Sequence, residues 1–369
     1  MKKIMYIHNA LALKGGIERV FADKMNMLVQ SGEYDVWMVT YDQGQHPLAF
    51  SLDRRVHYVD LDIRTHVQYQ YRGLRRLWER YRLNRLLRVH MKALLREVEP
   101  DIIITTTAGP LSLLDKLRGK TPLIVESHAS YEHLIDYAYM NILHRFDIRQ
   151  RYCLLHRVNV IVTLTETDAC RWRNAGYRNV VVIPNIVHFN DPGSSSYCLQ
   201  KNVLFVGRNA VQKDIPSLLE VWRRVYEQHP EWTLHIYGDG FHEGDLNDEA
   251  GVSVHNPVDD IFVKYRACAM LLLTSIWEPF GLVIPEAMSC GLPVVSFEGD
   301  GPCDIITDGV DGFIVKDRNI EAFANRVCQL MEDTELRKHM GQTAIFSVQR
   351  YSVEHIMPMW QELFESLKK

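Results

Sequence analysis

The chain has 369 residues, of which 47% are hydrophobic and 24% charged, so it is long enough for two domains with separate cores. No stretch approaches the roughly 20 uninterrupted apolar residues of a membrane span, and the first residues run directly into a strand, which predicts a cytosolic protein without a signal peptide. The seven cysteines never form CxxC and the 16 histidines show no HExxH pattern, so neither a disulfide framework nor a metal site is predicted.

Residues 3–7 form the first predicted strand, and a helix is predicted from about residue 18 to residue 31. Gly15 and Gly16 lie between them, where a glycine pair leaves backbone amides open at the C-terminal edge of a parallel sheet. A simple turn is the alternative interpretation of this pair. The pattern is not GxGxxG, so a nicotinamide site is not predicted.

Residues 36–39 and 56–60 are the next predicted strands, and a strongly basic segment, 64–96, follows them. This segment holds ten Lys and Arg against one acidic residue, Glu79, and its apolar residues recur at the three- and four-residue steps of a helix. Residues 1–190 have a net charge of +8 and residues 191–369 one of −12, so the segment supplies the whole positive balance of the first half.

Tryptophan and tyrosine are interleaved with the basic side chains of segment 64–96. This composition is typical of a helix that meets an anionic membrane surface, or an anionic acceptor. A solvated, arginine-rich helix face is the alternative. No nucleic-acid-binding module accompanies the segment, so nucleic acid is not a predicted partner.

Four more strands are predicted in the first half, at residues 100–104, 123–125, 159–163 and 180–183. His128 comes directly after the second of these, at the strand end where an open α/β sheet places its ligands. A structural hydrogen-bonding role is the alternative for a lone histidine. The segment 191–196, rich in Pro, Gly and Ser, is the clearest predicted linker.

The second half begins with a predicted strand at residues 203–206, followed by Gly207, Arg208 and Lys213. A glycine with two basic residues five positions apart suits a diphosphate, because arginine offers a fork of donors and lysine a point charge. Such a pair is also common on protein surfaces. A further strand is predicted at residues 233–237, and residues 252–258 are predicted to form a strand and the loop that follows it.

Residues 269–273 form a buried predicted strand, and a loop and a helix ending near residue 290 follow it. Glu278 lies in the loop and Glu286 one to two turns into the helix, with Phe280-Gly281-Leu282 between them. Open amides at the helix start suit phosphate, and carboxylates suit sugar hydroxyls. A helix cap and a solvated helix residue are the alternative interpretations of the two glutamates.

Residues 277–288 closely resemble the E-x7-E signature of the retaining glycosyltransferases of family 4, which have the GT-B fold. The match includes Pro-Phe-Gly at 279–281, Pro-Glu-Ala at 285–287 and the strand that begins at 291–295. The resemblance covers nearly the whole chain. This chain departs from the family pattern at two positions. Ile186 stands where the family has a glycine after Pro-Asn, and Asp214 stands where the family usually has glycine.

The resemblance implies an α/β protein of two Rossmann-like, doubly wound parallel-sheet domains that face a cleft. Residues 1–187 would form an acceptor-side domain that carries the basic segment 64–96. Residues 188–350 would bind the nucleotide sugar, and 351–369 would form a C-terminal helix that crosses back to the first domain.

The resemblance also implies roles for individual residues. Glu278 would hold hydroxyls of the donor sugar, Glu286 the ribose, and Val258 the base through its backbone. The implied catalytic residues are His128, Arg208, Lys213 and Glu278. The implied donor-binding residues are Gly15, Gly16, Val258, Phe280, Gly281, Leu282 and Glu286.

The implied activity is transfer of a hexose from a nucleoside diphosphate to a glycan or lipid-linked acceptor, with the α configuration retained and neither metal nor cofactor required. UDP-galactose, UDP-glucose and UDP-N-acetylglucosamine are the favoured donors, and GDP-mannose is the alternative. The implied setting is bacterial cell-surface polysaccharide or glycolipid synthesis, at the inner face of the cytoplasmic membrane. The alternatives are a sugar-nucleotide epimerase, a phosphorylase, or a non-catalytic protein that docks on lipid.

Overall fold

The chain divides into two compact units in the computed structural model, which describes residues 1–13, 15–132, 142–189, 200–241, 245–246, 248–258 and 260–367. Unit 1 comprises residues 1–163, 169–186 and 358–369, and unit 2 comprises residues 164–168 and 187–357. The boundaries expected from the sequence lay after residues 187 and 350. The predicted linker 191–196 lies outside the described residues.

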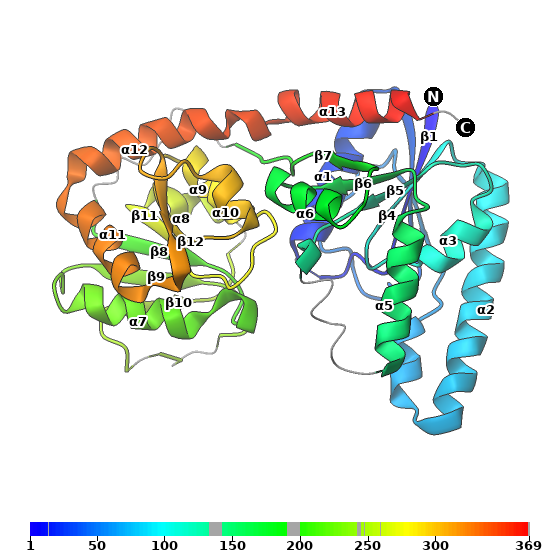
Figure 1. The fold of residues 1–369 in the computed structure, drawn as a ribbon, viewed down its shortest axis with the longest axis horizontal. Helices are drawn as coiled ribbons and strands as arrows, with labels where there is room; N and C mark the ends of the chain where they lie inside the picture. The colour runs from blue at the N-terminus through cyan, green and yellow to red at the C-terminus, as the bar shows by residue number, and fades with distance from the viewer. Residues whose placement is uncertain are drawn as a thin grey trace. The chain divides into compact units, whose positions relative to one another are not determined.

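Unit 1 is built on a seven-stranded sheet in the order β3-β2-β1-β4-β5-β6-β7, with every neighbouring pair parallel (Figure 1). Its central strands are continuous apolar runs because helices cover both faces of a parallel sheet. Ile4 pairs with Val36 on one side and with Ile102 on the other, and all three are buried. The strands are β1 Lys2–His8, β2 Tyr34–Thr40, β3 His57–Asp60, β4 Ile102–Thr106, β5 Leu123–Glu126, β6 Val160–Thr163 and β7 Val180–Val182.

Among the described residues of the first half of the chain, the helices are α1 Gly16–Gln30, α2 Gly73–Val98, α3 Leu111–Leu117, α5 Ile142–Leu155 and α6 Glu166–Asn174, with a 3-10 turn η1 at Thr65–Gln70. The helix predicted within the basic segment is therefore α2, which has 26 residues. Leu83, Leu87, Met91 and Leu94 form its buried stripe, at the spacing of an amphipathic helix. The basic side chains share the rest of its surface with exposed apolar residues, among them Leu74, Trp78 and Tyr81.

Unit 2 has a six-stranded parallel sheet in the order β10-β9-β8-β11-β12-β13 (Figure 1). The strands are β8 Asn202–Val206, β9 Thr233–Tyr237, β10 Val252–His255, β11 Met270–Leu273, β12 Val294–Phe297 and β13 Gly312–Val315. The helices are α7 Ile215–Tyr226, α8 Phe262–Arg266, α9 Val283–Ser289, α10 Asp300–Ile305, α11 Ile320–Glu332 and α12 Thr334–Ser347, with 3-10 turns η4 Val211–Lys213, η5 Lys316–Arg318 and η6 Val348–Tyr351.

The last helix, α13 Val353–Ser366, belongs to both units, since unit 2 ends at Met357 and unit 1 resumes at Pro358. Within unit 1, the Lys2 ammonium donates to the carbonyl of Phe364 at 2.5 Å, and the rings of Tyr34 and Phe364 lie 5.7 Å apart. The prediction of two parallel-sheet domains with a C-terminal helix that returns to the first is confirmed.

Strand order reverses direction at one point in each sheet, between β1 and β4 in unit 1 and between β8 and β11 in unit 2. In open α/β sheets, ligands bind beyond the carboxyl ends of the strands at this switch point, because the chain leaves the two strands in opposite directions and opens a crevice. The loops after these four strands are therefore where the fold places a binding site.

Candidate functional site

In unit 2, the loops that follow β8 and β11 are fastened together at the switch point. The side-chain amide of Gln212 donates to the carbonyl of Trp277 at 3.0 Å, and the amide of Ile276 donates to the carbonyl of Gln212 at 2.8 Å. The Thr274 hydroxyl donates to the carbonyl of Lys213 at 3.0 Å. The two loops therefore behave as one platform, although some 60 residues separate them in sequence.

Lys213 and Glu278 form an ion pair across this platform, with Nζ 2.5 Å from Oε2. The Ser275 hydroxyl donates to the same carboxylate oxygen at 3.1 Å. The side chains of Lys213 and Glu278 are only 15% and 10% exposed. The pair thus sets a cation, suited to phosphate oxygens, beside a carboxylate, suited to hydroxyl groups.

Two glycines make room for this pair. A Cβ at Gly207 would lie 3.2 Å from the stem of Lys213, so a larger residue would force the lysine stem to shift by a few tenths of an ångström. Gly281 has a φ of +80°, and a Cβ there would lie 2.7 Å from the Glu278 side chain. A side chain at either position would disturb the pair, and Gly281 also adopts a conformation that other residues rarely accept.

Glu286 is buried on α9, with 3% exposure, and its Oε2 accepts a hydrogen bond from the Tyr265 hydroxyl at 3.0 Å. It is therefore not a solvated helix residue, which was the alternative interpretation. Tyr265, from α8, was not singled out in the sequence, because its contact with Glu286 joins two separate helices. Leu282 precedes the first residue of α9, so its amide lies at the open start of that helix.

Three other residues predicted to contact the donor, Phe280, Arg208 and Val258, take no part in the ion pair. The ring of Phe280 is 2% exposed and packs edge-on against Tyr351 at 5.4 Å, so this side chain belongs to the core of unit 2. Arg208 is exposed just after β8, and Val258 is 37% exposed beyond β10. Both stay predictions as contacts to a donor.

Arg318 supports the platform from the adjoining loop and was not predicted. Its guanidinium donates to Asp214 at 2.5 Å, to the carbonyl of Ser275 at 3.0 Å and to that of Thr274 at 2.9 Å. Asp214 has a φ of +48° and caps α7 by accepting from the amide of Ser217 at 3.3 Å. This left-handed conformation explains why glycine suits the position, and the two hydrogen bonds explain how aspartate is accommodated.

In unit 1, a buried ion pair lies at the carboxyl end of β5. The Lys24 ammonium, from α1, is 2.5 Å from Glu126 Oε1, and the two side chains are 1% and 2% exposed. The same ammonium lies 3.8 Å over the ring of Trp360 from α13. Burial alone raises the pKa of Glu126, but Lys24 and His128 more than compensate, so its net shift is downward.

His128 extends this pair toward the strand end. Its Nε2 lies 3.2 Å from the second oxygen of Glu126, and its ring meets the edge of Phe21 at 5.6 Å. A hydrogen bond from Nε2 to a carboxylate leaves Nδ1 as the acceptor of the neutral ring. Glu126 therefore joins Lys24 to His128, and the three side chains form one buried chain that fixes the imidazole.

His8, at the end of β1, is a second buried histidine in this region, with 7% exposure. Burial first, and then the nearby His128, lower its pKa from 6.5 to about 4. His8 is therefore neutral near pH 7.

Gly15 and Gly16 form the start of α1, as predicted. Gly15 is the N-cap residue, with a φ of −107°, and its carbonyl accepts from the amide of Arg19 at 3.2 Å. A Cβ at Gly15 would overlap the carboxylate of Glu18. That carboxylate is the flexible end of its side chain and can move aside, so this contact does not by itself require glycine. A contact of Gly15 with a donor stays a prediction.

Comparison with known proteins relates both units to glycosyl transfer. The family model for glycosyltransferase family 4 matches residues 14–191, and that for glycosyl transferases group 1 matches residues 196–345. The amylovoran biosynthesis glycosyltransferase AmsD of Erwinia amylovora is 27% identical over 383 residues, which cover 98% of this chain and 99% of AmsD.

Solved structures share the fold over the full length. Sucrose-phosphate synthase of Thermosynechococcus elongatus has a TM-score of 0.80 at 18% identity, over 100% of this chain and 99% of its own. HepE of Anabaena, whose structure contains UDP and glucose, has a TM-score of 0.74 at 20% identity, over 100% of both chains.

Breaking the buried pair of unit 1 should be costly. Lys24→Met leaves Glu126 buried without its cation, and we expect it to lower the free energy of unfolding by about 3–5 kcal/mol. Lys24→Met combined with Glu126→Gln removes both charges and should recover a large part of that loss. Urea unfolding of the wild type, both single variants and the double variant measures this coupling, and simple additivity of the two losses would contradict it.

The depressed pKa of His8 predicts a pH dependence of stability. Between pH 6.5 and about 4, the unfolded chain takes up a proton at His8 that the folded chain does not. The contribution of His8 to the free energy of unfolding should therefore fall by about 1.4 kcal/mol per pH unit as the pH falls through this range. The difference between the wild type and His8→Asn in urea unfolding at several pH values isolates it, and parallel curves would refute it.

Proposed function

The chain belongs to glycosyltransferase family 4 and has the GT-B fold, and from this premise we propose that it moves a hexose from a nucleoside-diphosphate sugar to a glycan or lipid-linked acceptor, with the α configuration retained. The observation that carries the proposal is the ion pair of Lys213 and Glu278 at the switch point of unit 2. The proposed setting is cell-surface polysaccharide or glycolipid synthesis, in keeping with the name of AmsD.

The proposal assigns the donor to the platform of unit 2. Lys213 would meet the diphosphate, together with Arg208 and the amides at the start of α9. Glu278 would accept hydrogen bonds from hydroxyls of the sugar, and Glu286, already held by Tyr265, from the ribose. UDP is the proposed nucleotide, which agrees with the UDP bound to HepE.

The proposed reaction breaks the bond between the anomeric carbon and the β-phosphate oxygen and forms one to the acceptor oxygen. The leaving phosphate would take the proton of the acceptor hydroxyl on the same face of the sugar, so the products are an α-glycoside and UDP. Charge develops on the phosphate as the bond breaks, and Lys213 would stabilise it electrostatically in place of a metal ion. His128, held by Glu126, would support the sugar.

We further propose that α2 docks unit 1 on an anionic membrane surface. Its first turns expose large apolar side chains, with Leu74 at 85% exposure, Trp78 at 59% and Tyr81 at 67%. The Arg75 guanidinium lies 4.3 Å over the ring of Tyr71, so cations and aromatic rings alternate here. This is the composition of an interfacial helix. None of the described helices is long and apolar enough to span a membrane.

The roles of Lys213 and Glu278 can be separated in binding experiments. Lys213→Gln removes a charged contact to phosphate and should weaken UDP binding by about tenfold or more. Glu278→Gln keeps a side-chain oxygen that can accept a hydrogen bond from Lys213, so UDP binding should stay nearly unchanged. It should abolish sugar transfer, since the proposed partner of Glu278 is the sugar. Thermal unfolding against UDP, GDP and ADP in the presence of a chelator measures binding, and equal loss of UDP binding in both variants would refute this division.

Membrane docking through the start of α2 predicts a positional effect of apolar substitutions. Leu77 and Val89 are similarly exposed on α2, at 59% and 56%. Leu77→Ser should reduce binding to phosphatidylglycerol vesicles by about tenfold, because a buried leucine contributes about 1.5–3 kcal/mol. Val89→Ser, the matched control, should not. Equal binding of the two variants in vesicle flotation would show that the first turns of α2 do not enter the membrane.

A further inference from the structure

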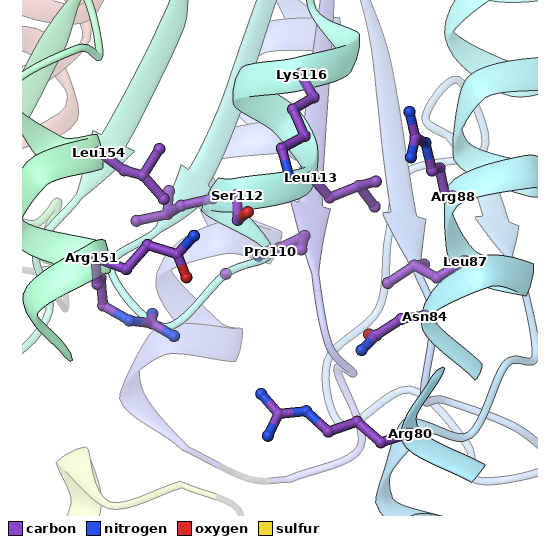
Figure 2. A pocket seen from close by; sticks show the side chains of 13 residues that line it. Arg80, Asn84, Leu87, Arg88, Pro110, Ser112, Leu113, Lys116, Arg151 and Leu154 are labelled. Atoms are coloured by element: carbon purple, nitrogen blue, oxygen red, sulfur yellow. The ribbon is translucent and has the colours of Figure 1, made fainter. Parts of the chain in front are cut away.

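Three helices of unit 1, α2, α3 and α5, surround a cavity of about 430 Å³ (Figure 2). This size falls within the range of small-molecule sites in proteins. The cavity draws on segments that lie far apart in the sequence. The basic segment therefore does more than present a flat charged face, since part of α2 forms one wall of a hollow.

The charged side chains that line this cavity are all basic: Arg80, Arg88, Lys116 and Arg151. None of its 13 described lining residues is acidic. Two acids of the neighbouring helical turns are paired elsewhere, Glu79 with Arg82 at 2.8 Å and Asp115 with Arg157 at 3.1 Å. Four cations thus share one concave space whose described lining residues include no acid, which favours an anionic ligand.

The four basic residues lie on three different helices, α2, α3 and α5. Arg80 and Arg88 lie about two turns apart on α2, and Lys116 projects from α3. Figure 2 shows Arg80 and Arg151 reaching into the space from opposite sides. The Arg151 guanidinium also donates to the carbonyl of Thr107, in the loop after β4, which anchors it at the switch point of the sheet.

Gly109 shapes the loop between this anchor and α3. A Cβ there would overlap the hydroxyl of Thr105 and lie 3.0 Å from the carbonyl of Thr106. The loop can therefore fold closely against the end of β4 only with glycine at this position. This close turn places the start of α3 beside α5 and leaves the hollow that the four basic side chains line.

We propose that this cavity binds a phosphate or diphosphate group of the acceptor. Guanidinium groups match phosphate oxygens with paired hydrogen bonds, and Lys116 adds a point charge. The identification of the ligand with the acceptor rests on the proposed function, whereas the anion site itself rests on the cavity and its charges. The site would hold the acceptor in unit 1, separate from the donor platform of unit 2.

Two double variants with equal loss of charge test this proposal. Arg88→Gln/Lys116→Gln removes two cations that line the cavity, and Arg85→Gln/Lys92→Gln removes two exposed cations of α2 that do not line it. Each full-length protein is titrated calorimetrically with pyrophosphate and with dodecyl diphosphate below its micelle concentration. Pyrophosphate also suits Lys213, so the cavity is judged only by the difference between the two double variants, which both leave unit 2 intact.

We expect the cavity variant to bind both diphosphates about tenfold more weakly than the control, because charge-assisted hydrogen bonds to phosphate are strong. Tighter binding of dodecyl diphosphate than of pyrophosphate would identify a lipid-linked acceptor, and equal binding would identify the diphosphate group alone. Equal affinities in the two variants would overturn the proposal. So would a difference seen only with phosphatidylglycerol vesicles, which would assign the cations to lipid headgroups.

These titrations need neither donor nor transfer. A protein that binds diphosphate in the cavity but fails to bind UDP would uphold the anion site and contradict the proposed function. UDP binding together with equal diphosphate affinities of the two double variants would contradict the anion site and leave the proposed function standing.

Discussion

The ion pair between Lys213 and Glu278 is the interaction on which the site in unit 2 depends. It joins the loop after β8 to the loop after β11, at the switch point where the order of the strands reverses. Glycines flank the pair on both sides, with Gly207 against the lysine stem and Gly281, at a φ of +80°, against the side chain of Glu278. Arg318 also binds both loops, through hydrogen bonds to Asp214 and to the carbonyls of Thr274 and Ser275. The cation and the carboxylate that we propose as contacts for the phosphate and the sugar of the donor are thus held in place by the protein itself.

Unit 1 uses a related arrangement at its own sheet edge. A lysine from the helix after the first strand, Lys24, neutralises a carboxylate at the end of a central strand, Glu126. The two ion pairs differ in burial. The ammonium of Lys24 lies over the ring of Trp360, and Glu126 contacts His128, which follows the end of the strand. A closed pair is suited to orienting another side chain, whereas the more open pair of unit 2 is suited to direct contact with a ligand.

Much of the fold could be predicted from the sequence, because continuous apolar runs mark the parallel strands. The two glutamates of the platform in unit 2 could also be singled out, because they lie in one recognisable stretch, 277–288. Other features depend on contacts between distant segments. Lys24 and Glu126 are 102 residues apart, and neither residue alone differs from an ordinary helix lysine or strand-end glutamate. The family resemblance implied that Phe280 contacts the donor; its ring is buried against Tyr351, and a donor contact stays a prediction. The cavity of unit 1 required three helices to be placed together.

Product analysis with single donors tests the central claim most directly. UDP-glucose, UDP-galactose, UDP-N-acetylglucosamine and GDP-mannose would each be incubated with the protein, with and without a bacterial lipid extract and with and without phosphate. The account predicts that one donor releases its nucleoside diphosphate, with the sugar recovered in α linkage on a lipid or glycan, only when the extract is present. Epimerised donor formed without the extract, or sugar 1-phosphate formed with phosphate, would contradict it, as would a product in β linkage.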